Sequence, residues 1–336
     1  MKRILKVLGG LVVLAIAGVA IVVTTCALRW QPEYPDTPLP AITASRDPAV
    51  IERGAYLVNA VAHCSACHSP SADYLASKPG DVVAPKGGHE WHMGPLGTIR
   101  SPNITSHPTT GIGNLSDGQI ARAIRYGIKA DHKGALFMMG VGPMSDEDLT
   151  AIVSYVRTIP AVDNTIAPND IGLMGKVLFQ GPMKFFQEPH DYATPPFVKE
   201  GETSIARGRY LAEGPGFCAG CHSDFTYEDR IVFVGQVNSG GRTNPFPDET
   251  EEGFVFYTPN LTNDPETGHM VAWTPEQFTK RMRAGRVYAG SPMPWETYRN
   301  MTDADIESIR LYLASLPPTR KNIGIVRRKA DEQLDP

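Results

Sequence analysis

The segments Cys64-Ser65-Ala66-Cys67-His68 and Cys218-Ala219-Gly220-Cys221-His222 decide the fold of this chain, because both follow the pattern C-x-x-C-H. Two cysteines three positions apart lie on one side of a helical turn, where their sulfurs can bond the two vinyl groups at one edge of a porphyrin. The histidine that follows can then reach the iron. The motifs therefore predict two covalently bound haem c groups. The predicted attachment residues are Cys64, Cys67, Cys218 and Cys221, and the predicted proximal iron ligands are His68 and His222.

Other chemistry uses paired cysteines too, since a C-x-x-C pair alone also occurs in zinc sites and in thioredoxin-like redox sites. A closed zinc site needs four ligands at short spacing, whereas these two pairs stand 154 positions apart. The adjacent histidine, present in both copies, favours haem. Of the five cysteines only Cys26 lies outside the motifs, so no disulfide is expected.

The composition is that of a globular protein. A chain of 336 residues with 42% hydrophobic content is long enough for two compact domains and an appendage. The formal net charge of −4 provides no basic surface for nucleic acid. Nucleic acid is therefore not expected among the partners.

The first 29 residues predict a membrane anchor. Lys2, Arg3 and Lys6 precede an apolar run over residues 7–23, which continues less purely to residue 28. The run is close to the length of a membrane span, and no convincing signal-peptide cleavage site follows it. The basic start places the remainder of the chain outside the cytoplasm, which is the side on which covalent haem is attached. We therefore expect one transmembrane helix in a bacterial inner membrane. The alternative is lipid attachment at Cys26, although threonine is larger than the residue usual before a lipidated cysteine.

An internal repeat sets the domain organisation, because the same landmarks return about 154 to 158 positions later. The matching pairs are Arg53-Gly54 with Arg207-Gly208, Gly87-Gly88 with Gly240-Gly241, Pro102-Asn103 with Pro259-Asn260, and Thr110-Gly111 with Thr267-Gly268. Each copy also contains two helix starts with capping residues: Ser116 and Gln119, Ser145 and Asp148, Thr274 and Gln277, and Thr302 and Asp305. The sequence thus predicts an all-α fold of two tandem domains.

The expected divisions follow from these landmarks. They are a membrane anchor (1–29), a proline-rich linker (30–48), a first haem domain (49–160), a connector (161–200), a second haem domain (201–319) and a charged, solvated tail (320–336). The last helix of each domain is expected to cross the first one. Gly54 and Gly208 lack a Cβ, so an aromatic ring from the crossing helix could approach them closely.

A sixth iron ligand is expected in each domain. Met293 lies in the proline-framed segment Ser291-Pro292-Met293-Pro294-Trp295, between the two capped helices of the second copy. Repeat alignment places Met139 opposite Met293, with Met138 as the alternative. A histidine and methionine pair raises the reduction potential and closes the iron to outside ligands, which suits electron transfer.

Two further groups of polar residues are candidates for a functional role. Asn103 and Asn260 are candidates for hydrogen bonding to the haem propionates, or else they stabilise turns. His89 and His92 form an H-x-x-H pattern that has no third ligand nearby and no counterpart in the second copy. A surface loop is the expected structure there.

The pattern R-G-x-Y-L, C-x-x-C-H, G-G, P-N-I-T, T-G, a methionine loop and S-D-E-D-L resembles class I cytochrome c domains of the cytochrome c subunits of membrane-bound dehydrogenases. The resemblance covers residues 51–318. It implies two tandem class I cytochrome c domains that take electrons from a periplasmic alcohol, aldehyde, sugar or gluconate dehydrogenase and pass them to a quinone, a cytochrome or a terminal oxidase.

The chain departs from that family in one respect. The better-known subunits of this kind resemble three-haem proteins, whereas two motifs and an N-terminal apolar segment are found here. The resemblance favours an electron-transfer subunit over a catalyst. Two alternatives are a di-haem peroxidase, which needs an open or bis-histidine iron, and a free-standing shuttle to an oxidase.

Overall fold

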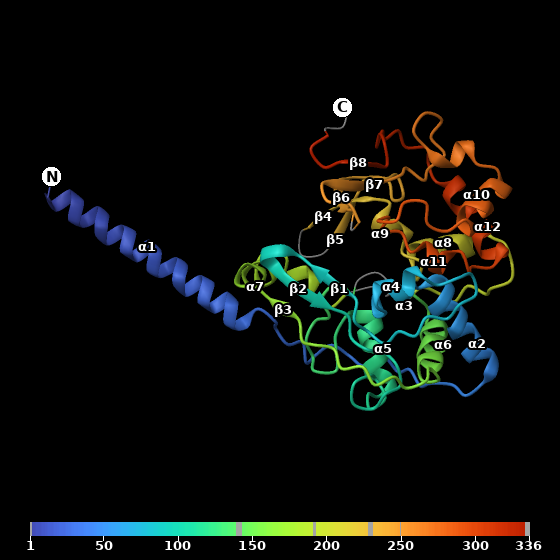
Figure 1. The fold of residues 1–336 in the computed structure, drawn as a ribbon, viewed down its shortest axis with the longest axis horizontal. Coiled ribbons are helices and arrows are strands. Elements are labelled where there is room, and N and C mark those ends of the chain that lie inside the picture. Colours follow the sequence, from blue (N-terminus) through green and yellow to red (C-terminus); the bar gives the residue numbers. More distant parts are fainter. Residues whose placement is uncertain (1, 139–142, 191–192, 228–230, 249, 333–336) are drawn as a thin grey trace.

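The computed structural model describes residues 2–138, 143–190, 193–227, 231–248 and 250–332. A long helix, α1 (Lys2–Arg29), projects from a body that holds the rest of the chain (Figure 1). Within α1, the segment Lys6–Arg29 is long and apolar enough to cross a membrane, and its most apolar 18-residue stretch has a mean hydropathy of 2.7. None of that segment's most apolar stretch is buried in the protein. The expected apolar N-terminal helix is therefore present.

The first half of the body contains a short set of helices. They are α2 (Pro48–Tyr56), the π-helical turn η1 (Leu57–Val61), α3 (Cys64–His68), α4 (Ser71–Leu75), α5 (Asp117–Tyr126) and α6 (Asp146–Val156). Helix α2 begins at a proline that needs no N–H partner, and the Asp47 side chain accepts a hydrogen bond from Ala49 N at 2.9 Å. The predicted capping box at Ser116 and Gln119 is present at the start of α5.

The second half repeats this order. Its helices are α8 (Ile205–Glu213), α9 (Cys218–Cys221), η4 (His269–Ala272), α10 (Pro275–Arg283), α11 (Trp295–Tyr298) and α12 (Asp303–Ser315). Helix α12 packs across α8 as α6 packs across α2. A Cβ at Gly54 would overlap the Ala151 carbonyl oxygen, and one at Gly208 would overlap the Ser308 carbonyl oxygen. The glycines therefore allow a close helix crossing as predicted, but the group that approaches both of them is a backbone carbonyl rather than an aromatic ring.

Three small antiparallel sheets correct the expectation of an all-α fold. The first joins β1 (Glu90–His92), β2 (Gly97–Arg100) and β3 (Asp170–Ile171), the second joins β4 (Asp224–Tyr227) and β5 (Ile231–Val234), and the third joins β6 (Gly241–Pro247), β7 (Phe254–Thr258) and β8 (Arg327–Lys329). The tail was expected to be solvated. Instead, β8 pairs with β7 in the register Val255 to Arg328, and the Arg328 side chain is buried. His92 is the last residue of β1 and His89 directly precedes that strand, so a strand stands where a surface loop was expected.

One hydrophobic core runs through both halves. It joins buried side chains of the first half, such as Leu57 and Leu149, to those of the second, such as Leu211 and Ile306. A smaller cluster of Ile99, Ile171, Phe179, Phe185 and Phe186 lies under the connector, which forms helix α7 (Leu173–Gln180) and the turn η3 (Lys184–Phe186).

Candidate functional site

Each C-x-x-C-H motif forms one helical turn that is entered through a left-handed residue. His63 precedes α3 with φ of 43°, and Phe217 precedes α9 with φ of 48°. This sharp change in chain direction starts a new turn shortly after the preceding helix. Both cysteines of each motif therefore lie on a short, separate element, of which His68 is the last residue in the first half and which His222 directly follows in the second. None of the four motif cysteines is joined in a disulfide.

The histidine of each motif is oriented by a backbone carbonyl. His68 Nδ1 lies 2.9 Å from Pro102 O, and His222 Nδ1 lies 3.0 Å from Pro259 O. Because a carbonyl oxygen only accepts, Nδ1 carries the proton in both rings, and the lone pair is left on Nε2. Burial lowers the pKa of both imidazoles, to about 4 for His222. Two neutral imidazoles with Nε2 as the donor atom, each directly after a C-x-x-C pair, fit covalent haem c.

The two asparagines of the repeated Pro-Asn-x-Thr segment build the loop that carries this carbonyl. Asn103 Oδ1 accepts hydrogen bonds from Thr105 N and Oγ1 at 2.9 and 2.7 Å, and its amide donates to Val162 O at 2.8 Å. Asn260 repeats this pattern with Thr262 and with Thr319 O. These contacts favour the turn-forming role. A role of either asparagine toward haem propionates stays a prediction.

The loop that carries Met293 is held by a buried ion pair. Arg286 Nη2 contacts Glu296 Oε2 at 2.7 Å, and Arg286 also donates to Ser291 O and, at 3.3 Å, to Met293 O. Trp295 N donates to Met293 O at 2.8 Å. Met293 itself is half-buried against the main core. A loop fixed in this way presents the methionine side chain from a rigid backbone.

In the first half, His190 of the connector contacts the backbone of the methionine segment. His190 Nε2 lies 3.0 Å from Met138 O, so Met138 O, like Met293 O, has a side-chain nitrogen at hydrogen-bonding distance. Met138 is half-buried against the main core, as Met293 is. Met139, which repeat alignment favours, lies outside the described residues.

The two motifs lie close together, on either side of the second-half helix α11. Buried Tyr298 donates from Oη to Gly216 O at 2.6 Å, two residues before Cys218. Its ring meets the His63 ring edge-on, with centroids 6.0 Å apart, directly before Cys64. Burial, and then the charge of Cys67, raise the pKa of the Cys221 thiol to about 11. The cysteines of the two motifs are therefore electrostatic neighbours.

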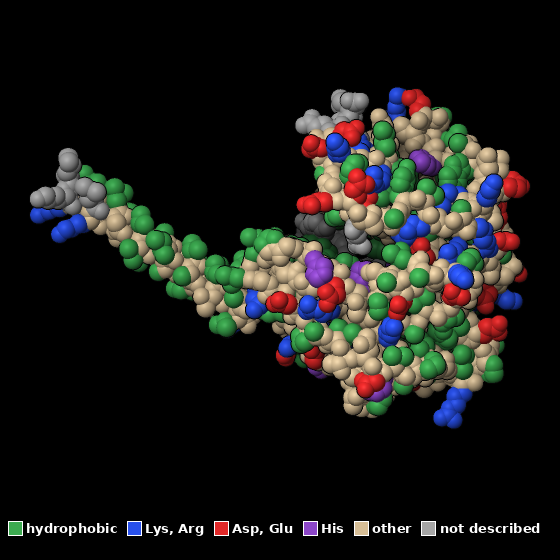
Figure 2. Space-filling view, viewed as in Figure 1, with side chains coloured by type: hydrophobic (Ala, Val, Ile, Leu, Met, Phe, Trp, Pro, Cys, Tyr) green, Lys and Arg blue, Asp and Glu red, His purple; other side chains and the backbone are tan. Residues whose placement is uncertain are grey.

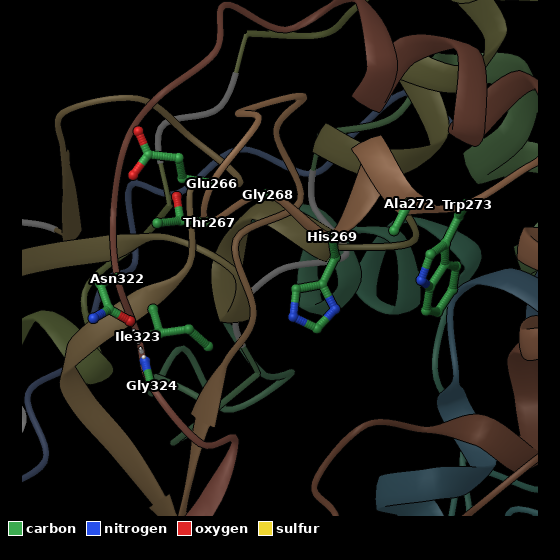
Figure 3. A pocket seen from close by; sticks show the side chains of 9 residues that line it. All are labelled: Glu266, Thr267, Gly268, His269, Ala272, Trp273, Asn322, Ile323 and Gly324. Atoms are coloured by element: carbon green, nitrogen blue, oxygen red, sulfur yellow. Dashed lines mark hydrogen bonds between the residues drawn. The ribbon is translucent and has the colours of Figure 1, made fainter.

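A cavity of about 380 Å³ lies in the second half, between residues 266–273 and residues 322–324 (Figure 3). His269 and Trp273 line one side of it, and Asn322 and Ile323 line the other. His269 N donates to Asn260 O at 2.8 Å, so the cavity borders the loop that orients His222. No group of three or more potential metal-ligating His, Cys, Asp or Glu side chains occurs in the part of the chain that the structure describes. His89 instead contacts Ser71 Oγ at 2.9 Å and the Trp91 ring.

Sequence reasoning missed three features of these sites. The carbonyls of Pro102 and Pro259 were not assigned, although the repetition of both prolines was a usable signal. Arg286 aligns with Ile128 of the first copy, so the repeat could not predict a role for Arg286. Tyr298 acts between the halves, and a repeat alignment carries no information on such contacts.

No family model matches the chain, but curated relatives do. The chain is 30% identical over 303 residues to the cytochrome c subunit of the alcohol dehydrogenase (quinone) of Gluconacetobacter polyoxogenes, which covers 84% of this chain and 59% of that protein. It is 27% identical over 314 residues to the fructose dehydrogenase cytochrome subunit of Gluconobacter japonicus, with 86% and 56% covered. It is 28% identical over 291 residues to the gluconate 2-dehydrogenase cytochrome c subunit of Pantoea cypripedii, with 80% and 60% covered.

These similarities confirm the resemblance to cytochrome c subunits of dehydrogenases that the motifs predicted. They extend over most of this chain, whereas the chain spans only 56% to 60% of the length of the three relatives.

Proposed function

We propose that this chain is a membrane-anchored periplasmic di-haem cytochrome c, which relays electrons from a periplasmic dehydrogenase to a quinone, a cytochrome or a terminal oxidase. One observation carries the proposal: in both motifs the imidazole Nδ1 is bonded to a proline carbonyl, which leaves Nε2 as the donor atom. A redox-active cysteine pair has no need of a histidine oriented in this way, and a closed zinc site would need further ligands, of which no group of three or more occurs among the described residues.

Two tandem class I cytochrome c domains, one per half, would hold the groups. Cys64 and Cys67 would attach the first haem and Cys218 and Cys221 the second, with His68 and His222 as proximal ligands. When bound, each haem iron supplies a reversible one-electron change. The chain's own residues orient both imidazoles, bury that of His222, half-bury that of His68, and lower the pKa of both. The proximity of the two motifs across α11 supports electron transfer between the halves.

Methionines would supply the sixth ligands. In the second half, the clamped loop supports Met293. In the first half we favour Met138, because its carbonyl contacts His190 as that of Met293 contacts Arg286. Met139, preferred by alignment alone, is the alternative. Methionine at both irons would exclude outside ligands and so disfavour a peroxidase.

The upstream and downstream partners follow from the relatives. Three of them are named as cytochrome subunits of alcohol, fructose and gluconate dehydrogenases. A dehydrogenase catalytic subunit is therefore the proposed electron donor. Helix α1, with its basic start, would anchor the body at the periplasmic side of the inner membrane.

The first test measures haem in the full-length protein purified in detergent. We expect two haems per chain that stay attached after denaturation and give a c-type pyridine haemochrome. Replacing Cys64 and Cys67 by Ala, or Cys218 and Cys221 by Ala, should each remove one haem. The control Cys26→Ala should keep both. A single haem in the wild type, or haem that extracts into acidic acetone, would contradict the proposal.

The second test addresses the relay. The tagged full chain, purified from its native membrane, should bring with it a dehydrogenase catalytic subunit. Addition of that enzyme's substrate without oxygen should then reduce both haems. Rapid turnover of hydrogen peroxide by the purified chain, with a five-coordinate or bis-histidine iron, would instead indicate a di-haem peroxidase.

A further inference from the structure

Helix α7 lies against the last turns of α1. Of the α1 side chains whose burial is described, all are exposed except Val23, Cys26 and Ala27. A spacing of three and four positions puts these on one face of the helix, and half-buried Trp30 continues the same stripe. Helix α7 packs beside α1. The stripe is therefore the surface on which the body contacts α1.

A buried amide ties the two helices together. Gln187 Nε2 donates to Trp30 O at 2.6 Å, directly after α1, and to Phe179 O at 2.7 Å, within α7. Gln187 is only 1% exposed, so both bonds are made away from water. The position of α7 along the axis of α1 is thus fixed by the fold rather than by a flexible linker.

The outer face of α7 is apolar and uncovered. Buried Gly175 and Phe179 face the body, and a Cβ at Gly175 would overlap the Leu96 carbonyl. Leu173 and Met174 are 58% and 53% exposed. The helix has the sequence LMGKVLFQ, in which Lys176 is the only charged residue. Figure 2 shows apolar side chains along α1 that continue onto the region where it joins the body.

Because α7 lies beside the last turns of α1, the position of α1 in a membrane would also set how deep α7 lies in the bilayer. Residues 23–30 extend about 10 Å along a helix axis at about 1.5 Å per residue. The 24-residue apolar segment of α1 is about 36 Å long by the same rise, whereas the hydrocarbon core of a bilayer is about 30 Å thick. The last turns of a membrane-spanning α1, and α7 beside them, would therefore lie at the boundary between acyl chains and head groups.

We propose that α7 is a second membrane contact, with Leu173 and Met174 inserted into the lipid interface beside α1. Lys176 would extend its charged end toward the head groups while its aliphatic stem lies along the apolar surface. This contact would set the orientation of the haem-bearing body on the bilayer. The proposal rests on the membrane anchoring proposed for α1. It places lipid, rather than a protein partner, against the exposed face of α7.

The test is photo-crosslinking of the full-length protein in phospholipid nanodiscs. A benzophenone amino acid replaces Leu173, Met174, Val13 or Ile205, one at a time, and lipid adducts are measured by intact-protein mass spectrometry. Val13, in the middle of α1, reports whether α1 spans the membrane. Ile205 is the matched control because it is 50% exposed, like Met174, and starts α8 on the side of the body away from α1.

We expect phospholipid adducts at positions 13, 173 and 174, and none at 205. Adducts at 13 without adducts at 173 and 174 would overturn the α7 contact while the anchor stands. No adduct at 13 would overturn the anchor and the α7 contact together. In native membranes, crosslinks from 173 and 174 to a protein in place of lipid would also overturn the proposal. The haemochrome of each variant is unaffected by any of these outcomes, so a failure here is distinguishable from a failure of the haem assignment.

Discussion

Tyr56 of the first half donates a 2.6 Å hydrogen bond to Asp305 of the second, although the two residues are 249 positions apart. The aligned pair makes the same bond from the second half to the first: Tyr210 Oη donates to Asp148 Oδ2 at 2.5 Å. Each tyrosine oxygen also accepts from the backbone N–H that starts the partner half's last helix, Thr302 N and Ser145 N. The two halves therefore cap each other's last helix.

Each carboxylate in this exchange is also held by an arginine of its own half. Arg207 contacts both oxygens of Asp305, through Nε at 2.9 Å and Nη2 at 2.8 Å, and Arg53 Nε contacts Asp148 Oδ1. Both carboxylates are buried, so the loss of any donor leaves a charge less well compensated.

The first prediction concerns these tyrosines. Tyr56→Phe and Tyr210→Phe should each lower the free energy of unfolding by about 1.5–3 kcal/mol, the range for a hydrogen bond to a charged group. The double variant should also weaken the coupling between the halves, which chemical denaturation would reveal as two transitions. Tyr155→Phe is the control, because the Tyr155 hydroxyl contacts Asn59 of its own half at 3.0 Å. A double variant that still unfolds in one sharp transition would contradict the coupling.

The second prediction separates the methionines. Met293→Ala should remove the sulfur-to-iron near-infrared band of one haem and lower its potential, with both haems retained. Met138→Ala should do the same to the other haem, whereas Met139→Ala should leave both bands in place. If Met139→Ala removes the band and Met138→Ala does not, the repeat alignment is the better guide, and the His190 contact has no bearing on ligation.

The local parts of these sites were readable from sequence, and the distant parts were not. The helix starts at Ser116 and Thr274 could be predicted because a capping box involves residues only three positions apart. The strands were missed because their partners are remote: β2 pairs with β3 of the connector, and β7 pairs with β8 of the tail. The exchange between Tyr56 and Asp305 was missed because an internal repeat shows which positions correspond, not which copies touch.

A third prediction tests the loop that holds Met293. Arg286→Lys keeps a positive charge near Glu296 but loses the forked donors to the Ser291 and Met293 carbonyls. The second haem should show a weaker sulfur-to-iron band and a lower potential, while the first haem is unchanged. The control is Arg209→Lys, since Arg209 makes an exposed pair with Glu213. Equal shifts at both haems would indicate a general loss of structure rather than a positioning role.

A fourth prediction concerns acid stability. Burial raises the pKa of Asp248, but hydrogen bonds from Thr250 and Arg327 outweigh it and hold that pKa below its usual range. A carboxylate of this kind stabilises the fold above its unfolded-state pKa of about 3.9, and the stabilisation is lost as the pH falls through the lower folded value. Asp248→Asn should therefore be less stable than wild type at pH 7 and lose less stability below about pH 4. Circular dichroism during acid titration measures this, with surface Asp131→Asn as a control that should follow wild type.

The last prediction tests the helix crossing that underlies both halves. A Cβ at Gly208 would overlap the Ser308 carbonyl and also approach Ile309 N to 2.9 Å, so the added methyl group meets backbone that cannot rotate away. Gly208→Ala should lower the free energy of unfolding by about 3 kcal/mol or more, at or beyond the upper end of the usual cost of overpacking. Gly54→Ala should act similarly on the first half, where the Ala151 carbonyl is in the way. Gly118→Ala is the matched control, because its Cβ would lie 3.4 Å from Leu39 Cβ, and alanine is the better helix former in α5. The measurement is chemical denaturation of the full-length protein, followed by circular dichroism for helix and by haem absorbance for each site. A Gly208→Ala protein as stable as Gly118→Ala would show that the crossing of α8 and α12 is looser than the structure describes.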